Sequence, residues 1–236
     1  MKKLILIFIA LSFFSVCFAG SIQDMHKAAI ARKNAAPTTV FDENFDNCDT
    51  GTGFGNCDES WGTAGSFTVT AAEGPDASQA VIYAGSTDAT YSLNNTLGAG
   101  DFTITIDFKI DSGVADIDDL MIYFQDTDGD IGIQVYIRYD DPPTMRVSTY
   151  GHTEGFVTIC SGESIANWYT ITIDDINWTN HTYDIDVSIK DGASQGNNDN
   201  CEFLTTDADN IDDIYLKGST ANVVDFRIDN FLITEP

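Results

Sequence analysis

DFTITIDFKI, residues 101–110, alternates apolar and polar side chains with a period of two. Because successive side chains of a β-strand point to opposite faces, this pattern predicts a strand with one buried face. The apolar face carries Phe102, Ile104, Ile106, Phe108 and Ile110, and the polar face carries Thr103, Thr105, Asp107 and Lys109. The same alternation recurs in IGIQVYIR (131–138), WYTITID (168–174) and TYDIDVSIK (182–190).

Turn-forming residues separate these stretches. DTDGD (126–130), YDDPP (139–143), TNH (179–181) and KDGASQGNND (190–199) are rich in Gly, Pro, Asn and Asp, which favour tight turns. No helical stripe of comparable length follows Pro37. Many half-buried strands joined by turns predict an all-β fold, a two-sheet antiparallel β-sandwich. We assign it to residues 38–236, a normal length for one such domain.

The first 37 residues differ from the rest of the chain. Two lysines precede an apolar stretch, Leu4 to Phe14, and the small residue Ala19 follows, a pattern typical of a cleaved secretory signal over residues 1–19. The apolar stretch is shorter than the ~20 residues of a membrane-spanning helix, so we expect no transmembrane segment in the mature chain. Residues 20–37 are Ala-rich and basic, and we interpret them as a leader or tether: a pro-segment, a short packed helix or a disordered arm. The signal is of bacterial type and predicts a secreted, cell-surface or periplasmic protein.

The chain is strongly acidic, with 11 basic and 37 acidic residues and a net charge of −26. Removal of the signal takes two lysines and no acid, which leaves 9 basic residues against 37 acidic ones, or −28. A field of this sign makes nucleic acid and anionic membranes poor partners. It has two interpretations: a solvated surface suited to salty water, or a surplus of carboxylates some of which bind Ca²⁺.

Four cysteines remain after removal of the signal: Cys48, Cys57, Cys160 and Cys201. An even number in an exported chain predicts disulfides, and four cysteines allow three pairings. Pairing Cys48 with Cys57 closes a Gly-rich loop, and pairing Cys160 with Cys201 joins two later strands. A zinc site is the weaker interpretation, because the chain has no Cys-x-x-Cys pair and only three histidines.

Five stretches together resemble the concanavalin A-like lectin/glucanase superfamily, which includes laminin G-like domains. They are FDENFDN (41–47), SWGTAGSFTV (60–69), DFTITIDFKI (101–110), NWYTITIDDINWTNHTYDIDVSI (167–189) and VVDFRIDNFLI (223–233). The resemblance implies a jelly roll of two curved sheets. Members of the superfamily are glycan binders or glycan-cleaving enzymes, and the fold alone does not decide between them.

The resemblance directs attention to one polar row. β-Glucanases of this fold carry Glu-x-Asp-x-x-Glu on a strand, which this chain lacks. Polysaccharide lyases use Gln-x-His with a Tyr and an Arg; here Gln134, Tyr136 and Arg138 share one strand face, with Tyr136 where the lyase pattern has His. We interpret the row as a carbohydrate-binding surface. Trp178, in the polar turn DINWTNHT (175–182), has two interpretations: a stacking face for sugar rings, which we include in the predicted carbohydrate site, or a cap on the end of the sandwich.

A calcium site is implied where the first and last strands of such a jelly roll lie side by side. The matching acids are Asp42, Glu43 and Asp46 at the start and Asp229 at the end. Solvated edge-strand acids are the alternative. In DTDGD the three aspartates resemble a Ca²⁺ loop, but the bidentate Glu is missing, so we expect a hairpin turn there.

These observations predict a non-catalytic carbohydrate-binding or adhesive domain, stabilised by Ca²⁺. The acidic charge favours a neutral or cation-bridged glycan as the ligand. The alternative is a structural or assembly protein of the cell envelope or extracellular matrix, assembled at the cell surface. A polysaccharide lyase comes third.

Overall fold

The computed structural model describes residues 37–52, 54, 56–59, 61, 67–83, 89–98, 100, 102–112, 119–140, 144–218 and 225–236. The predicted signal (1–19) and, except for Pro37, the predicted leader (20–37) lie outside these residues. Residues 39–235 form one compact unit. Within the part of the chain that is described, no helix is long and apolar enough to cross a membrane.

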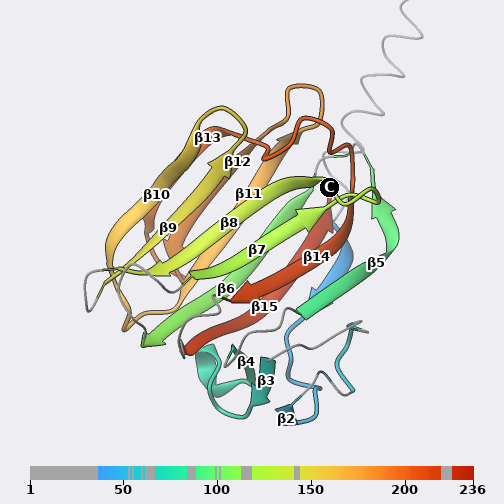
Figure 1. Ribbon diagram of the computed structural model, residues 1–236. Coiled ribbons are helices and arrows are strands. Elements are labelled where there is room, and N and C mark those ends of the chain that lie inside the picture. Colours follow the sequence, from blue (N-terminus) through green and yellow to red (C-terminus); the bar gives the residue numbers. More distant parts are fainter. Residues whose placement is uncertain are drawn as a thin grey trace, which may run out of the picture. The chain divides into compact units, whose positions relative to one another are not determined.

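Two antiparallel sheets make up the described structure (Figure 1). The nine-stranded sheet has the order β13-β12-β11-β6-β15-β4-β3-β2, with β1 paired to β15, and the six-stranded sheet has the order β10-β9-β8-β7-β14-β5. The bounds are β1 Thr38–Glu43, β2 Gly51–Thr52, β3 Phe67–Thr70, β4 Ala80–Tyr83, β5 Ala89–Leu97, β6 Thr103–Ser112, β7 Asp119–Gln125, β8 Ile131–Tyr139, β9 Thr144–Gly151, β10 Gly155–Ser164, β11 Tyr169–Asn177, β12 Thr182–Ile189, β13 Ser194–Glu202, β14 Ile211–Gly218 and β15 Asp225–Glu235. A short 3₁₀ turn, η1, spans Pro75–Ala77.

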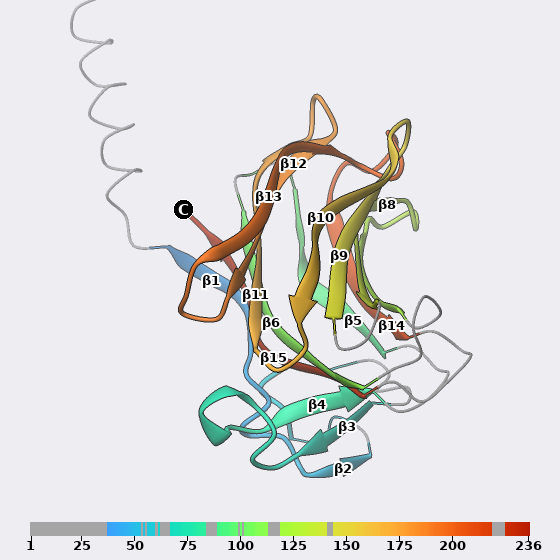
Figure 2. The ribbon, with the colours of Figure 1, turned by 90° about the vertical axis from the view of Figure 1, so that its left-hand side faces the viewer.

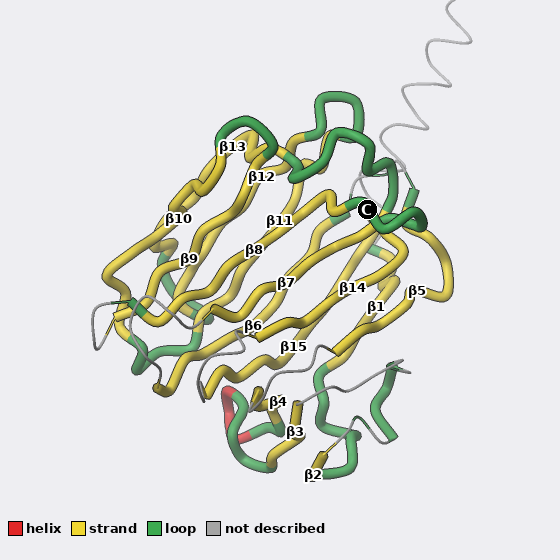
Figure 3. The backbone as a smooth tube through the Cα atoms, in the orientation of Figure 1, coloured by secondary structure: helices red, strands yellow, loops and turns green. Residues whose placement is uncertain are grey.

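The all-β sandwich predicted from the sequence is confirmed. Figure 2 shows the two sheets edge-on and face to face, and Figure 3 shows that strand dominates the described chain. Each alternating stretch is a strand: residues 101–110 supply β6, 131–138 supply β8, 168–174 supply β11 and 182–190 supply β12.

Strand β6 lies at the centre of the nine-stranded sheet, between β11 and β15. Its apolar face is fully buried from Ile104 to Ile110, and Ile106 is the register partner of Ile171 on β11. In the six-stranded sheet, Ile133, Val135 and Ile137 of β8 are buried in the same core. The apolar faces predicted by the period-two pattern therefore pack against each other between the two sheets.

The hairpin expected at DTDGD connects β7 to β8. The backbone N–H of Asp126 donates to the carbonyl of Asp130 at 3.0 Å, and Gly129 has the positive φ of 88° that this turn requires. The carboxylate Oδ1 of Asp126 accepts from the backbone N–H groups of Asp128 (2.9 Å) and Asp130 (2.8 Å). The aspartates close a turn, as predicted.

Truncation of the central strand tests this core. We expect Ile106→Ala to lower the free energy of unfolding by about 2–5 kcal/mol, because it leaves a cavity in a closely packed interior. Thr105→Ala, on the opposite face of the same strand, should change it by less than about 0.5 kcal/mol. Urea unfolding measures both, and equal effects of the two variants would contradict the assigned faces.

Candidate functional site

The outer face of the six-stranded sheet, which faces the viewer in Figure 1, carries the polar row predicted from the sequence. Gln134, Tyr136 and Arg138 alternate with the buried residues of β8, so the structure places all three on this face. Gln134 is only 4% exposed, and its Nε2 donates to the hydroxyl of Tyr136 at 2.7 Å. Gln134 therefore orients Tyr136 and offers little surface of its own.

Three aromatic rings gather on this face; we call Tyr136, Tyr150 and Phe156 the aromatic cluster. The ring of Phe156 lies 4.9 Å from that of Tyr136 and 4.8 Å from that of Tyr150, in edge-to-face geometry. Among the described residues, Phe156 is the one large apolar side chain that is exposed, with 58% of its surface accessible. Together with the two tyrosine rings it contacts, Phe156 offers an aromatic surface on which a ligand could stack.

A pocket of about 200 Å³ opens beside the cluster. Three neighbouring strands line it: β8 with Tyr136 and Arg138, β9 with Arg146 and Ser148, and β10 with Phe156 and Thr158. Arg138 and Arg146 are register partners across β8 and β9, as are Tyr136 and Ser148. Arg146 and Phe156 were not predicted from the sequence, because only strand pairing brings them beside Tyr136. A weak signal existed at Phe156, an aromatic residue that shares the polar face of β10 with Thr158.

A carboxylate from the other sheet holds the β9–β10 hairpin between Tyr150 and Phe156. The Glu202 Oε2 accepts from the backbone N–H groups of Thr153 (2.8 Å) and Glu154 (3.1 Å). Hydrogen bonds from Thr153 lower the pKa of Glu202, because they stabilise the charged form. A Cβ on Gly151 would lie 2.8 Å from that of Glu202, so only glycine permits this approach. We call this contact the Glu202 clamp; it fixes the hairpin that carries Tyr150 and Phe156, two of the three rings of the aromatic cluster.

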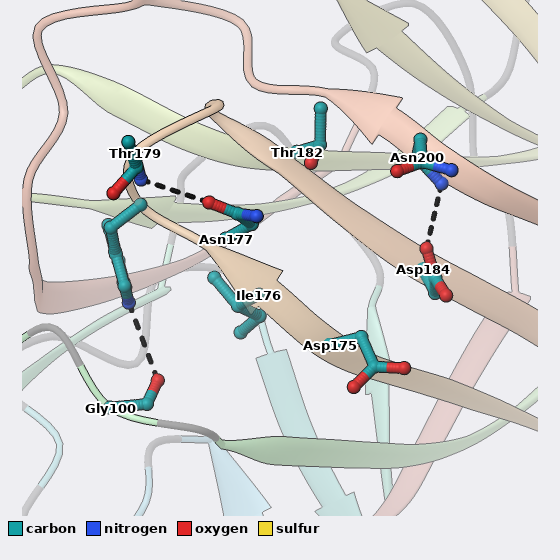
Figure 4. Close-up of a pocket in the computed structure, with 9 residues that line it drawn as sticks. Gly100, Asp175, Ile176, Asn177, Thr179, Thr182, Asp184 and Asn200 are labelled. Carbon is teal, nitrogen blue, oxygen red and sulfur yellow. Dashed lines mark hydrogen bonds between the residues drawn. The ribbon is translucent and has the colours of Figure 1, made fainter.

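Trp178 lines a different pocket, of about 520 Å³, shown in Figure 4. Its Nε1 donates to the carbonyl of Gly100 at 3.4 Å, and its ring packs edge-to-face against buried Phe203. The structure therefore does not bring Trp178 into the pocket of Tyr136 and Arg138. Its half-buried ring packs the β11–β12 turn against the core.

Carboxylates converge beside the Trp178 pocket. The oxygens of Asp174, Asp175 and Asp184 come within 4.8 Å of one another, and this acidic triad could hold a cation. Burial raises the pKa of Asp174, and the charges of Asp175 and Asp184 raise it further. Asp175 occupies an irregularity of the β11–β12 pairing, with φ of 47°. The sequence analysis did not single out this triad.

Two of the four residues expected to bind calcium meet at the loop before β4. Asp229 is fully buried on β15, and its Oδ2 accepts from the Ser78 hydroxyl at 2.7 Å. Asp46 accepts from the backbone N–H of Gln79, the next residue, at 2.8 Å. Burial raises the pKa of Asp229 to about 7, and the charge of Asp46 contributes. The loop presses closely on Asp229, since a Cβ on Gly74 would lie 2.6 Å from its Oδ2.

The other two predicted ligands have different surroundings. Glu43 is fully buried, and its carboxylate accepts from the backbone N–H groups of Phe45 (2.8 Å) and Glu59 (3.0 Å). Burial raises its pKa. Asp42 is exposed on β1. Glu43 thus anchors the loop after β1 and Asp42 faces solvent, so neither has a recorded contact with Asp229.

One of the expected disulfides forms and the other does not. Cys48 is bonded to Cys57, whereas Cys160 and Cys201 are free and buried. The predicted pairing of Cys160 with Cys201 is wrong in this structure, because Cys160 of β10 lies against Gly196 of β13. Five residues of strand, about 16 Å, separate Gly196 from Cys201, well beyond the reach of a disulfide.

No protein-family model and no curated protein matches the chain. Solved structures do. A carbohydrate esterase of the Shiga toxin-encoding bacteriophage phi24B matches with a TM-score of 0.58 and 14% identity, over 85% of this chain and 99% of that one. An endo-β-1,4-glucuronan lyase from the fungus Trichoderma reesei matches with a TM-score of 0.54 and 12% identity, over 84% and 96%. Peanut lectin matches with a TM-score of 0.54 and 12% identity, over 86% and 98%.

The chain has the concanavalin A-like lectin/glucanase fold. The predicted resemblance is thereby confirmed at the level of the fold. Non-catalytic lectins and carbohydrate-active enzymes both share it, so the function must be argued from the residues of the site.

For the mature chain, which lacks the predicted signal and its Cys17, the cysteine arrangement predicts two thiols. Native protein should react slowly with iodoacetamide at neutral pH, because Cys160 and Cys201 are buried and burial raises the pKa of Cys160 to about 11. After unfolding without reductant, mass spectrometry should find two alkylated cysteines, at positions 160 and 201. If no cysteine is alkylated, Cys160 and Cys201 form a disulfide after all. If all four are alkylated, the Cys48–Cys57 disulfide is absent.

Proposed function

We propose that this protein is an exported, non-catalytic carbohydrate-binding domain whose ligand lies on the outer face of the six-stranded sheet. The observation that carries the proposal is the aromatic cluster, with exposed Phe156 beside a pocket lined by polar groups. The C–H faces of sugar rings stack on aromatic rings, and planar polar side chains hydrogen-bond their hydroxyl groups. The Cys48–Cys57 disulfide supports export, since such bonds persist in oxidising compartments.

The state of Gln134 supports binding over lyase chemistry. A lyase of this fold uses Gln beside His to act on the substrate, whereas here Gln134 is buried and donates to Tyr136. Tyr136 stands at the position of that His. Gln134 therefore holds the ring and the hydroxyl of Tyr136 in place for contact with a ligand. Because the site is shallow, a single glycan chain should bind in the micromolar to millimolar range, about −8 to −4 kcal/mol.

Removal of the exposed ring tests the location of the site. We expect Phe156→Ala to weaken glycan binding at least tenfold, about 1.4 kcal/mol, with little change in Tm, because the ring is more than half exposed. The measurement is affinity electrophoresis against neutral, carboxylated and sulfated polysaccharides, followed by calorimetry with those that retard the protein.

Trp178→Phe is the matched control, because it keeps an aromatic ring against Phe203 in the other pocket. It should leave binding unchanged. Loss of binding in Trp178→Phe but not in Phe156→Ala would move the site to the Trp178 pocket. Failure of the wild-type protein to bind any polysaccharide would end the carbohydrate-binding proposal and favour a structural role.

We also propose that Ca²⁺ binds where Asp46 and Asp229 approach the loop before β4. An orphaned oxygen supports this position: the Oε1 of Gln79 is buried and accepts no hydrogen bond from the described residues. Two carboxylates, this amide oxygen and backbone carbonyls are the hard oxygen ligands that Ca²⁺ takes. A bound cation would also offset the cost of ionising Asp229, which burial disfavours.

Calcium should raise Tm beyond the effect of matched ionic strength. A ligand at a hundredfold excess over its Kd stabilises the folded state by about 2.7 kcal/mol.

The rise in Tm caused by Ca²⁺ should be larger at pH 8 than at pH 5. The pKa of Asp229 is raised to about 7, so at pH 5 a proton occupies the carboxylate and competes with Ca²⁺. Without Ca²⁺, this group's contribution to stability should fall as pH rises from about 4 to 7, because the folded state then binds the proton more tightly than the unfolded state.

Two variants locate the ion. Asp229→Asn should abolish the calcium-dependent rise in Tm, and Asp184→Asn, in the acidic triad, should keep it. The opposite result would place the ion at the triad. An unchanged response in both variants would contradict both sites.

A further inference from the structure

The positive charges of the folded domain are unevenly distributed. From residue 38 onward the chain has six: Lys109, Arg138, Arg146, Lys190, Lys217 and Arg227. Three belong to the nine-stranded sheet or its turns, and each is paired with a carboxylate: Lys109 with Asp111, Lys190 with Asp107, and Arg227 with Glu73 and Asp111.

The other three basic residues, Arg138, Arg146 and Lys217, lie on the outer face of the six-stranded sheet. They alternate with buried residues of β8, β9 and β14. Half of the domain's positive charges therefore share the face that carries the aromatic cluster. Asp119 of β7 is a register partner of Arg138, so this face combines positive and negative positions, unlike the strongly acidic chain as a whole.

Two of these charges are placed directly opposite one another. Arg138 and Arg146 are register partners on neighbouring strands, and both line the same pocket. Like charges at such positions repel and destabilise a sheet. Arg146 pairs weakly with Asp140, whose Oδ2 lies 4.0 Å from the Nε of Arg146, at the outer limit of an ion pair. An arginine pair of this kind is suited to an anion that bridges both groups.

The pocket offers hydrogen-bond donors in excess of acceptors. Its six lining residues include two guanidinium groups, three hydroxyl groups and no carboxylate. The hydroxyl of Tyr136 accepts from Gln134, so its own proton is donated in another direction. Guanidinium groups bind carboxylate and sulfate oxygens through two parallel hydrogen bonds, a geometry that a neutral hydroxyl cannot match.

We infer that the glycan bound on this face is acidic, with a carboxylate or sulfate group that occupies the Arg138–Arg146 pocket while a neighbouring ring stacks on Phe156. This rests on the proposed carbohydrate-binding function and names its ligand class. It reverses the expectation of a neutral or cation-bridged glycan, which came from the net charge alone. Charges separated by more than about 8 Å are largely screened at physiological ionic strength, so the acids of the opposite sheet oppose such a ligand only weakly.

Three soluble probes separate the outcomes for the mature chain: a neutral galactomannan, polygalacturonate for carboxylate, and carrageenan for sulfate. At least one acidic probe should bind tenfold or more tightly than the neutral one, with an affinity that falls as salt rises. The better of the two acidic probes identifies the anionic group. Preference for the neutral probe would overturn the inference and leave the carbohydrate-binding function standing; no binding to any probe would overturn both.

Variants test the arginine pair itself. Arg138→Gln and Arg146→Gln should each weaken binding of the acidic probe at least tenfold, with little change in Tm, because both side chains lie on an outer sheet face and not in the core. Arg146→Lys keeps the positive charge but lacks the planar guanidinium group, and it should weaken binding at least threefold.

Lys109→Gln, which removes one positive charge from the other sheet, is the matched control and should bind like wild type. Equal losses in Lys109→Gln and Arg146→Gln would show a non-specific charge effect and contradict the pocket, as would normal binding by both arginine-to-glutamine variants.

Discussion

The packing of two apolar sheet faces against each other is the constraint on which the rest of this structure depends. Strand β6 lies in the middle of the nine-stranded sheet and buries Ile104, Ile106, Phe108 and Ile110 completely. Each side chain of this size contributes about 1.5–3 kcal/mol when it leaves water. Since a slip of one residue would turn this face outward, the burial also fixes the register of every neighbouring strand.

Register then decides what the outer faces can do. Once Val135 and Ile137 point inward, Tyr136 and Arg138 must point outward. The pairing of β8 with β9, and of β9 with β10, then brings Arg146 and Phe156 beside them. None of these strands carries the pocket alone. The Glu202 clamp adds a link between the sheets, because a residue of β13 holds the hairpin that joins β9 to β10. The site is thus a consequence of the core rather than an addition to it.

Although the chain as a whole is strongly acidic, several of its carboxylates are buried and hydrogen-bonded and are not part of a solvated surface. On the nine-stranded sheet, buried Asp107 accepts hydrogen bonds from Thr170 (2.5 Å), Lys190 (2.6 Å) and Asn230 (2.9 Å), so a carboxylate on the polar face of β6 is part of a bonded network. Buried acids at Glu43 and Asp229 are likewise held by N–H or hydroxyl donors. A buried charge requires such partners because its desolvation is costly. Of the three basic residues on this sheet and its turns, Lys190 belongs to the Asp107 network, whereas Lys109 and Arg227 pair with Asp111.

The sequence by itself determined four strands (β6, β8, β11 and β12), their buried faces, the turn at DTDGD and the sandwich, because alternation and turn chemistry are local properties that each segment expresses alone. The turn predicted over 190–199 was wrong in its second half, because β13 begins at Ser194. The sequence also placed Gln134, Tyr136 and Arg138 on one face, and brought Asp46 and Asp229 into the same hypothesis through family resemblance. Only the tertiary structure decided which strands pair. Strand pairing in turn set the register of Arg138 opposite Arg146, the exposure of Phe156, the separation of Trp178 from the polar row and the distance between Cys160 and Cys201. Those features depend on contacts between segments far apart in the chain, whose register is set by packing of the whole core and leaves no mark in any one stretch of sequence.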